Sequence, residues 1–103
     1  LEQDDFLNGC LELDTLLTPE ELLERLHAIE LAANRERKVH WGPRTLDLDV
    51  IFYDDLVYES ERLSIPHTQM HKRDFVLKPL AEIAPYKRHP IFGETVAEML
   101  DMV

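Results

Sequence analysis

The chain opens with a segment whose polar and apolar positions alternate. Residues 6 to 15 read FLNGCLELDT, and their period of two is typical of a β-strand. Leu7, Gly9, Leu11 and Leu13 would share one face of that strand, with Phe6, Asn8, Cys10 and Glu12 on the other. We therefore expect a strand over residues 6–15.

A helix-like pattern follows directly. Thr18-Pro19-Glu20-Glu21 predicts a helix start, because Thr18 can cap the helix, Pro19 suits its first position and Glu21 completes a capping box. Apolar residues then recur at helical spacing, at Leu22, Leu26, Ile29 and Ala33, with Leu23 beside them. We expect these residues to form the core face of a helix that ends near Asn34.

The sequence of the second half of the chain predicts a strand, a short partner strand and two helices. Residues 46 to 53 (LDLDVIFY) read as a strand, and Asp54-Asp55 would turn it into a partner over residues 56–58. After an ordered loop over residues 64–71, a helix is expected from Arg73 to Ala84, kinked or split by Pro79. A last helix begins after Thr95, with Glu98 in the capping-box position and Val96, Met99 and Leu100 facing inward. This order predicts an α+β fold, a ferredoxin-like α/β sandwich with helices packed on a mainly antiparallel sheet.

Length and net charge limit the number of domains and the classes of binding partner. With 103 residues the chain fits a single domain over residues 1–103, and its net charge of −10 disfavours binding to nucleic acid or anionic membranes. A single cysteine, Cys10, excludes an internal disulfide, and neither a signal peptide nor a membrane-spanning run is evident, so we expect a cytoplasmic protein.

The charge is distributed unevenly. Residues 1–34 carry nine acidic residues and one basic residue, a net of −8. Residues 35–44 carry four basic residues and one acidic residue, a net of +3, and Gly42-Pro43 in this stretch favours a loop. A solvated basic loop would explain this stretch, but arginines also offer bidentate donors to phosphate oxygens.

Asp47 and Asp49 follow this loop on the predicted second strand. Alternate residues of a strand project from one face with Cα atoms about 6.6–6.8 Å apart, whereas Leu46, Leu48 and Val50 would point into the core. Paired carboxylates suit Mg²⁺ shared with substrate phosphates, and their spacing suits two metal ions that clamp a transferring phosphoryl group. The alternative is an exposed edge strand whose acidic residues only maintain solubility.

Longer runs of sequence carry a specific resemblance. Residues 40–55 (HWGPRTLDLDVIFYDD), 64–67 (SIPH) and 70–80 (MHKRDFVLKPL), with Asp5-Phe6-Leu7-Asn8 and Ile29-Glu30, resemble the 6-hydroxymethyl-7,8-dihydropterin pyrophosphokinases of folate biosynthesis. The similarity extends over essentially the whole chain. The resemblance implies transfer of the terminal pyrophosphate of ATP to the hydroxymethyl oxygen of the pterin, with AMP as the second product.

The resemblance also implies roles for individual residues. Asp47 and Asp49 would hold two Mg²⁺ ions, and together with Arg35 and Arg44 they would form the catalytic group. ATP would be bound by residues from several segments, namely Glu30, Arg35, Arg37, Trp41, Arg44, Val50, Arg62, Ser64, His67 and Arg73. The pterin would contact Phe6, Asn8, Trp41 and Phe75.

The resemblance leaves two points open. The family's opening strand, the following helix and the next strand have no counterpart here, so we expect the chain to be the C-terminal portion of a longer enzyme. The missing part, or a second chain, is then an expected partner beside ATP and the pterin. The alternatives are a non-catalytic remnant that binds a nucleotide or a partner chain, and another two-metal nucleotidyl transferase, which the W-G-P-R-T spacing disfavours.

Overall fold

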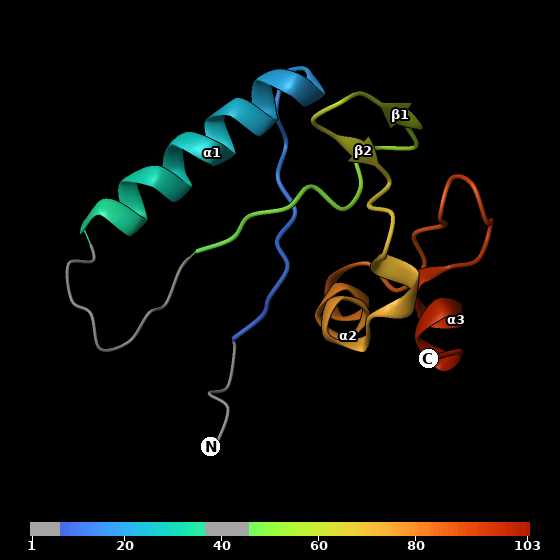
Figure 1. Cartoon of the computed structure of the whole chain (residues 1–103). Helices are drawn as coiled ribbons and strands as arrows, with labels where there is room; N and C mark the ends of the chain where they lie inside the picture. The colour runs from blue at the N-terminus through green and yellow to red at the C-terminus, as the bar shows by residue number, and fades with distance from the viewer. Residues whose placement is uncertain (1–6, 37–45) are drawn as a thin grey trace.

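The computed structural model describes residues 7–36 and 46–103 (Figure 1). A long helix, α1 (Pro19–Glu36), stands on one side of the molecule, and α2 (Asp74–Ile83) and α3 (Val96–Asp101) lie together on the other. Between them in the sequence come β1 (Tyr58–Glu59), β2 (Ser64–Ile65) and the 3-10 helix η1 (Met70–Lys72). The pair β1–β2 lies near the amino-terminal end of α1.

Helix α1 begins where the sequence predicts. The Oγ1 atom of Thr18 accepts a hydrogen bond from the Glu21 amide at 3.2 Å, and the Glu21 carboxylate accepts one from the Thr18 amide at 2.9 Å. The helix continues to Glu36, two residues beyond the expected end. Of its predicted core face, Leu22 and Leu26 are half-buried and pack with the buried Leu23, and Ala33 is half-buried, whereas Ile29 is 51% exposed, contrary to expectation.

The two long strands expected at 6–15 and 46–53 were predicted wrongly where the structure describes them. Residues 7–15 and 46–53 are extended but belong to no strand. Alternation specifies which side chains share a face, whereas a strand also needs a neighbour for its backbone N–H and C=O groups. No segment among the described residues forms a ladder with either of them.

The one sheet in the described part of the chain is the antiparallel pair β1–β2, in which Tyr58 pairs with Ile65 and Glu59 with Ser64. The expected turn at Asp54-Asp55 is present, and the Leu56 amide donates to the Tyr53 carbonyl at 3.0 Å. The predicted pairing of residues 56–58 with residues 46–53 was wrong, because Tyr58 pairs with Ile65 of the following strand β2.

Helices α2 and α3 form the second half of the core. Pro79 lies inside α2 without splitting it, and Leu77 and Leu80 are buried against α3, whereas Phe75 and Ile83 are exposed. Thr95 and Glu98 form the predicted capping box at the start of α3, where Val96 and Met99 are buried.

The described residues form two apolar clusters. One contains Met70, Leu77, Leu80, Val96 and Met99 and packs against Cys10, Ile51 and Phe52. The other joins α1 to the β1–β2 pair through Leu23, Val50, Leu63 and Ile65. The α+β class is thus confirmed, whereas the described residues do not contain the broad sheet of a sandwich. No helix among them has the length and apolar character needed to cross a membrane.

Candidate functional site

Asp47 and Asp49 lie on the extended segment that begins at residue 46. Both side chains are exposed, whereas Val50 is 8% exposed and packs in the cluster around Leu23. The prediction that Leu46, Leu48 and Val50 all face the core holds only for Val50, because Leu46 is 39% exposed and Leu48 half-buried. The segment therefore enters the core just after the two aspartates, which remain accessible to a ligand.

Helix α1 holds this segment through two polar side chains one turn apart. The Oε2 atom of Glu30 accepts a hydrogen bond from the Leu48 amide at 2.6 Å, and Oδ1 of Asn34 accepts one from the Leu46 amide at 3.3 Å. The Leu48 amide belongs to the peptide that joins Asp47 to Leu48. Glu30 thus fixes the backbone between the two predicted metal ligands, while its expected contact with ATP remains a prediction.

The donor set at Asp47 and Asp49 fits a cation that is shared with phosphates. The described residues contain no group of three or more His, Cys, Asp or Glu side chains that could enclose a metal ion. Mg²⁺ needs no such group, because it commonly binds one or two carboxylates and takes its other ligands from water and substrate phosphates. Two exposed carboxylates at alternate positions suit that mode of binding.

His67 lies beside the same segment on its other side. Its amide donates to the Ile51 carbonyl at 3.0 Å, and its Nδ1 atom accepts from the Gln69 amide at 3.1 Å. Because Nδ1 is an acceptor, the proton of the neutral ring lies on Nε2. His67 can therefore present a ring N–H donor close in sequence to Ser64 and close in space to the segment that carries Asp49.

The β1–β2 pair carries two more of the predicted nucleotide residues. Ser64 opens β2 and is half-buried. Arg62 lies in the connection before it, and its guanidinium is 3.8 Å from the Glu24 carboxylate of α1. Since both side chains are largely exposed, this ion pair is weak, and Arg62 can leave Glu24 for a phosphate at little cost.

The two predicted pterin residues that the structure describes, Asn8 and Phe75, lie on neighbouring segments. Phe75 lies in the first turn of α2, and the guanidinium of Arg73 lies 5.6 Å from its ring centroid. Asn8 lies on the extended segment that contacts the same turn, where Sγ of Cys10 approaches the Val76 carbonyl at 3.9 Å. Burial raises the pKa of the Cys10 thiol, so the thiol stays protonated at neutral pH.

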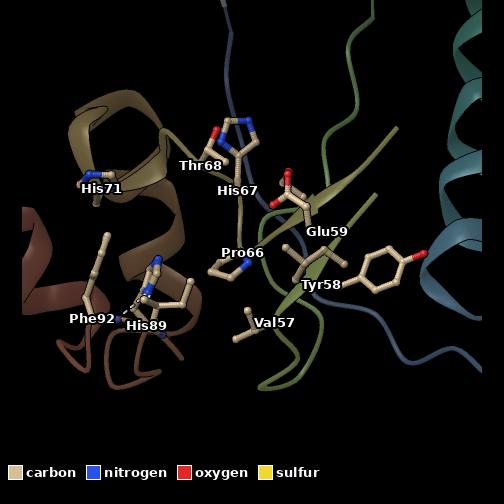
Figure 2. Close-up of a pocket in the computed structure, with 12 residues that line it drawn as sticks. Val57, Tyr58, Glu59, Pro66, His67, Thr68, His71, His89 and Phe92 are labelled. Carbon is tan, nitrogen blue, oxygen red and sulfur yellow. Dashed lines mark hydrogen bonds between the residues drawn. The ribbon is translucent and has the colours of Figure 1, made fainter. Parts of the chain in front are cut away.

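A pocket of about 310 Å³ lies between the β1–β2 pair and the loop that precedes α3 (Figure 2). Ser64 and His67 line one side of it, and His71, His89 and Phe92 line the other. The His89 ring stacks on Phe92 at 4.2 Å between centroids, and Phe92 also meets His71 edge-on at 4.8 Å. This aromatic group has no counterpart among the residues predicted from sequence.

Several predicted site residues lie outside the described part of the chain, namely Phe6, Arg37, Trp41 and Arg44. Arg35 lies in the last turn of α1, and its side chain is likewise outside the description. The described residues thus bring together Glu30, Asp47, Asp49, Val50 and His67, with Arg62 and Ser64 on the adjoining hairpin.

Sequence reasoning missed a polar group that joins α1 to the hairpin. The Oε2 atom of Glu20 accepts hydrogen bonds from Tyr58 Oη at 2.7 Å and from Ser60 Oγ at 2.6 Å. These bonds from Ser60 and Tyr58 lower the pKa of Glu20, and Glu20 in turn raises the pKa of Tyr58. The partners are 38 and 40 residues apart, and no local pattern links them.

Comparison with known proteins identifies the family. The family model described as 7,8-dihydro-6-hydroxymethylpterin-pyrophosphokinase (HPPK) matches residues 1–85. The 2-amino-4-hydroxy-6-hydroxymethyldihydropteridine pyrophosphokinase of Synechocystis sp. is 52% identical over 101 residues, which cover 98% of this chain and 52% of that protein. The protein of the same name from Pseudomonas aeruginosa is 48% identical over 99 residues, covering 96% and 60% respectively.

A longer relative shows the same similarity. The bifunctional protein FolKE of Lactococcus lactis subsp. lactis is 50% identical over 101 residues, which cover 96% of this chain and 29% of that protein. The chain spans 52% and 60% of the length of the two pyrophosphokinases. Together with the family match over residues 1–85, these identities show that the chain belongs to the 7,8-dihydro-6-hydroxymethylpterin-pyrophosphokinase family.

Proposed function

We propose that the protein transfers pyrophosphate from ATP to 6-hydroxymethyl-7,8-dihydropterin in folate biosynthesis. The family match over the residues that include Asp47 and Asp49 carries this proposal. In the reaction the hydroxymethyl oxygen attacks the β-phosphorus of ATP, and the bond from that phosphorus to the bridging oxygen of AMP breaks. AMP leaves with the electron pair, and the hydroxyl proton passes to solvent.

Asp47 and Asp49 would hold two Mg²⁺ ions, which supply charge neutralisation for the triphosphate and the attacking oxygen when bound. The exposure of both side chains and the anchoring of their backbone by Glu30 support this role. Preorganised carboxylates need little rearrangement when a cation binds, so the anchoring lowers the cost of assembling the site.

The other residues would bind and orient the two substrates. Arg35 and Arg44 would contact the phosphates with help from Arg37, and Trp41 would help to close the site. Glu30, Val50, Arg62, Ser64, His67 and Arg73 would line the nucleotide site. Phe6 and Phe75 would enclose the pterin ring, and Asn8 would hydrogen-bond its edge.

Substitution of either aspartate tests the proposal. We expect Asp47→Asn and Asp49→Asn to lower Mg²⁺-dependent formation of AMP from ATP and the pterin by at least about a hundredfold. Both variants should keep the fold, with equal or slightly higher stability, because repulsion between the carboxylates falls. AMP and ADP are separated by chromatography, and Mg²⁺ binding is measured directly by calorimetry.

Asp101→Asn provides the matched control, since it removes the same charge from the exposed end of α3. Unchanged turnover in either site variant would refute the metal role. Release of ADP instead of AMP would refute pyrophosphate transfer.

The second candidate is a non-catalytic remnant of the enzyme that binds a nucleotide or a partner chain. The extended segment 7–15 favours it, because Leu7 is 99% exposed and Leu11 and Leu13 are also exposed. Such apolar side chains on an unpaired segment can be covered by another strand. ATP binding without AMP formation would support this candidate over the first.

We also infer that residues 1–103 form the C-terminal part of a single ferredoxin-like pyrophosphokinase domain. The unpaired segments 7–15 and 46–53 support this inference, since both have strand-like sequences and lack a neighbour among the described residues. A cytoplasmic location, the absence of nucleic-acid or membrane partners, and the association with a missing segment or second chain stay predictions.

A further inference from the structure

The β1–β2 hairpin, which contains Arg62 and Ser64, is too short to be stable through its own ladder. Its two strands contribute only two residues each. An isolated two-stranded hairpin is at most marginally stable in water, so contacts outside the ladder must fix a pair this short. Leu63 and Ile65 supply an apolar contact by packing in the cluster with Leu23 and Val50.

Glu20 supplies the polar contact. Its carboxylate receives one hydroxyl from β1, through Tyr58 at 2.7 Å, and one from the residue after β1, through Ser60 at 2.6 Å. Figure 2 shows the Tyr58 ring pointing away from His89 and Phe92 toward α1. Hydrogen bonds to an ionised acceptor are about twice as strong as neutral ones, so this carboxylate is a strong anchor for β1.

Ser60 connects Glu20 to the residues between the two strands through hydrogen bonds. While its hydroxyl donates to Glu20, the same Oγ accepts the amides of Arg62 at 3.2 Å and Leu63 at 3.1 Å. The Ser60 amide also donates to the Leu63 carbonyl at 2.8 Å. The Ser60 hydroxyl therefore links the backbone of Arg62 directly to the Glu20 carboxylate.

We propose that Glu20 is a positioning residue for the nucleotide subsite, which acts through Tyr58 and Ser60 to place Arg62 and Ser64. Glu20 touches neither substrate in this proposal. The inference rests on the proposed function, since it takes Arg62 and Ser64 as nucleotide-binding residues. It adds that the first turn of α1 fixes the geometry of that subsite.

The test separates nucleotide binding from turnover. Glu20→Ala removes both charge-assisted hydrogen bonds to the hairpin and should raise the KM for ATP by a factor of about 5 to 10, because only part of the free energy they supply is passed on to ATP binding. The kcat and the KM for the pterin should change less than about twofold, because Asp47 and Asp49 are anchored separately by Glu30. Glu20→Gln keeps an acceptor oxygen and should recover part of the ATP affinity.

Two further variants follow the connection from Glu20 to the hairpin. Tyr58→Phe and Ser60→Ala should each raise the KM for ATP, and Ser60→Ala more strongly, because Ser60 contacts the Arg62 backbone. Glu82→Ala is the control, since it removes the same charge from the exposed side of α2. Circular dichroism and thermal unfolding establish whether each variant is folded.

The outcomes are decisive. An unchanged KM for ATP in the folded Glu20→Ala variant would overturn the proposal. A fall in kcat and a rise in the KM for the pterin as large as the rise in the KM for ATP would overturn it too. Direct titration with ATP separates this result from failure of the proposed function. If the wild-type chain binds ATP without forming AMP, the proposed function fails. The ATP dissociation constants of the variants then still test whether Glu20 positions the nucleotide subsite. A wild-type chain that binds no ATP overturns both.

Discussion

At the residue scale, His89 is the clearest case of a side chain whose protonation the fold controls. It is 3% exposed, and its Nδ1 atom accepts the amides of Ile91 at 3.2 Å and Phe92 at 3.1 Å. A nitrogen that accepts two N–H groups cannot carry a proton itself. Burial lowers the pKa of His89, the nearby His71 lowers it further, and Glu94 opposes the shift.

This arrangement predicts a loss of stability in mild acid. Because the folded pKa of His89 lies below the unfolded value of about 6.5, the unfolded chain binds more protons between the two values. The contribution of His89 is therefore fully present above pH ~6.5 and is lost as the pH falls from there through the folded pKa. Urea unfolding at pH 7.5 and at successively lower pH measures the change in free energy of unfolding.

His89→Asn is the matched variant for this prediction. An asparagine Oδ1 can accept the amides of Ile91 and Phe92 but does not titrate. The variant should therefore lose less stability than the wild type over the same pH interval. An identical pH dependence in the two proteins would assign the acid sensitivity to other groups.

Sequence reasoning could propose site residues where they are close together in the chain, and it missed contacts between distant positions. Asp47 and Asp49 are two positions apart, and their spacing together with the basic stretch before them led to the predicted Mg²⁺ and phosphate site. Glu20 and Ser60 are 40 residues apart, and each alone is an ordinary helix or loop residue. Their contact exists only because Leu23 and Ile65 bring α1 and the hairpin together.

At the scale of elements, the same contrast separates the helices from the strands. The capping boxes at Thr18 and Thr95 are complete within four residues, so the sequence predicts both helix starts correctly. A strand is specified by its neighbour as well as by its own pattern. The alternating segments 7–15 and 46–53 illustrate this, since they stay extended without a ladder among the described residues.

Helix α1 compensates for one missing ladder by holding segment 46–50 with side chains. Glu30→Ala would leave the Leu48 amide without its acceptor, and we expect a loss of about 1 kcal/mol in the free energy of unfolding. Glu30→Gln, which keeps an acceptor oxygen, should lose less. Urea denaturation of both variants measures the difference, and equal losses would mean that the charge rather than the hydrogen bond to Leu48 matters.

At the scale of the whole molecule, we expect the two apolar clusters to have different roles in stability and in placing the site. The cluster of η1, α2 and α3 is built from residues between 70 and 99, close together in the sequence. The cluster of Leu23, Val50, Leu63 and Ile65 joins segments that are far apart, and the predicted nucleotide residues Arg62 and Ser64 adjoin it. We therefore expect the first cluster to carry most of the stability and the second to place the site.

Leu77 tests the contribution of the first cluster to stability. It is 0% exposed at the centre of the first cluster, so Leu77→Ala removes buried contacts and leaves a cavity, at a cost of roughly 2–5 kcal/mol. Leu16→Ala makes the same chemical change at a fully exposed side chain and should alter the free energy of unfolding by less than about 0.5 kcal/mol. Urea unfolding followed by far-ultraviolet circular dichroism measures both values. A small domain is typically stable by about 5–15 kcal/mol, so the Leu77 variant would lose a large share of that margin. Similar losses in the two variants would show that the burial of Leu77 in the α2–α3 cluster does not stabilise the chain.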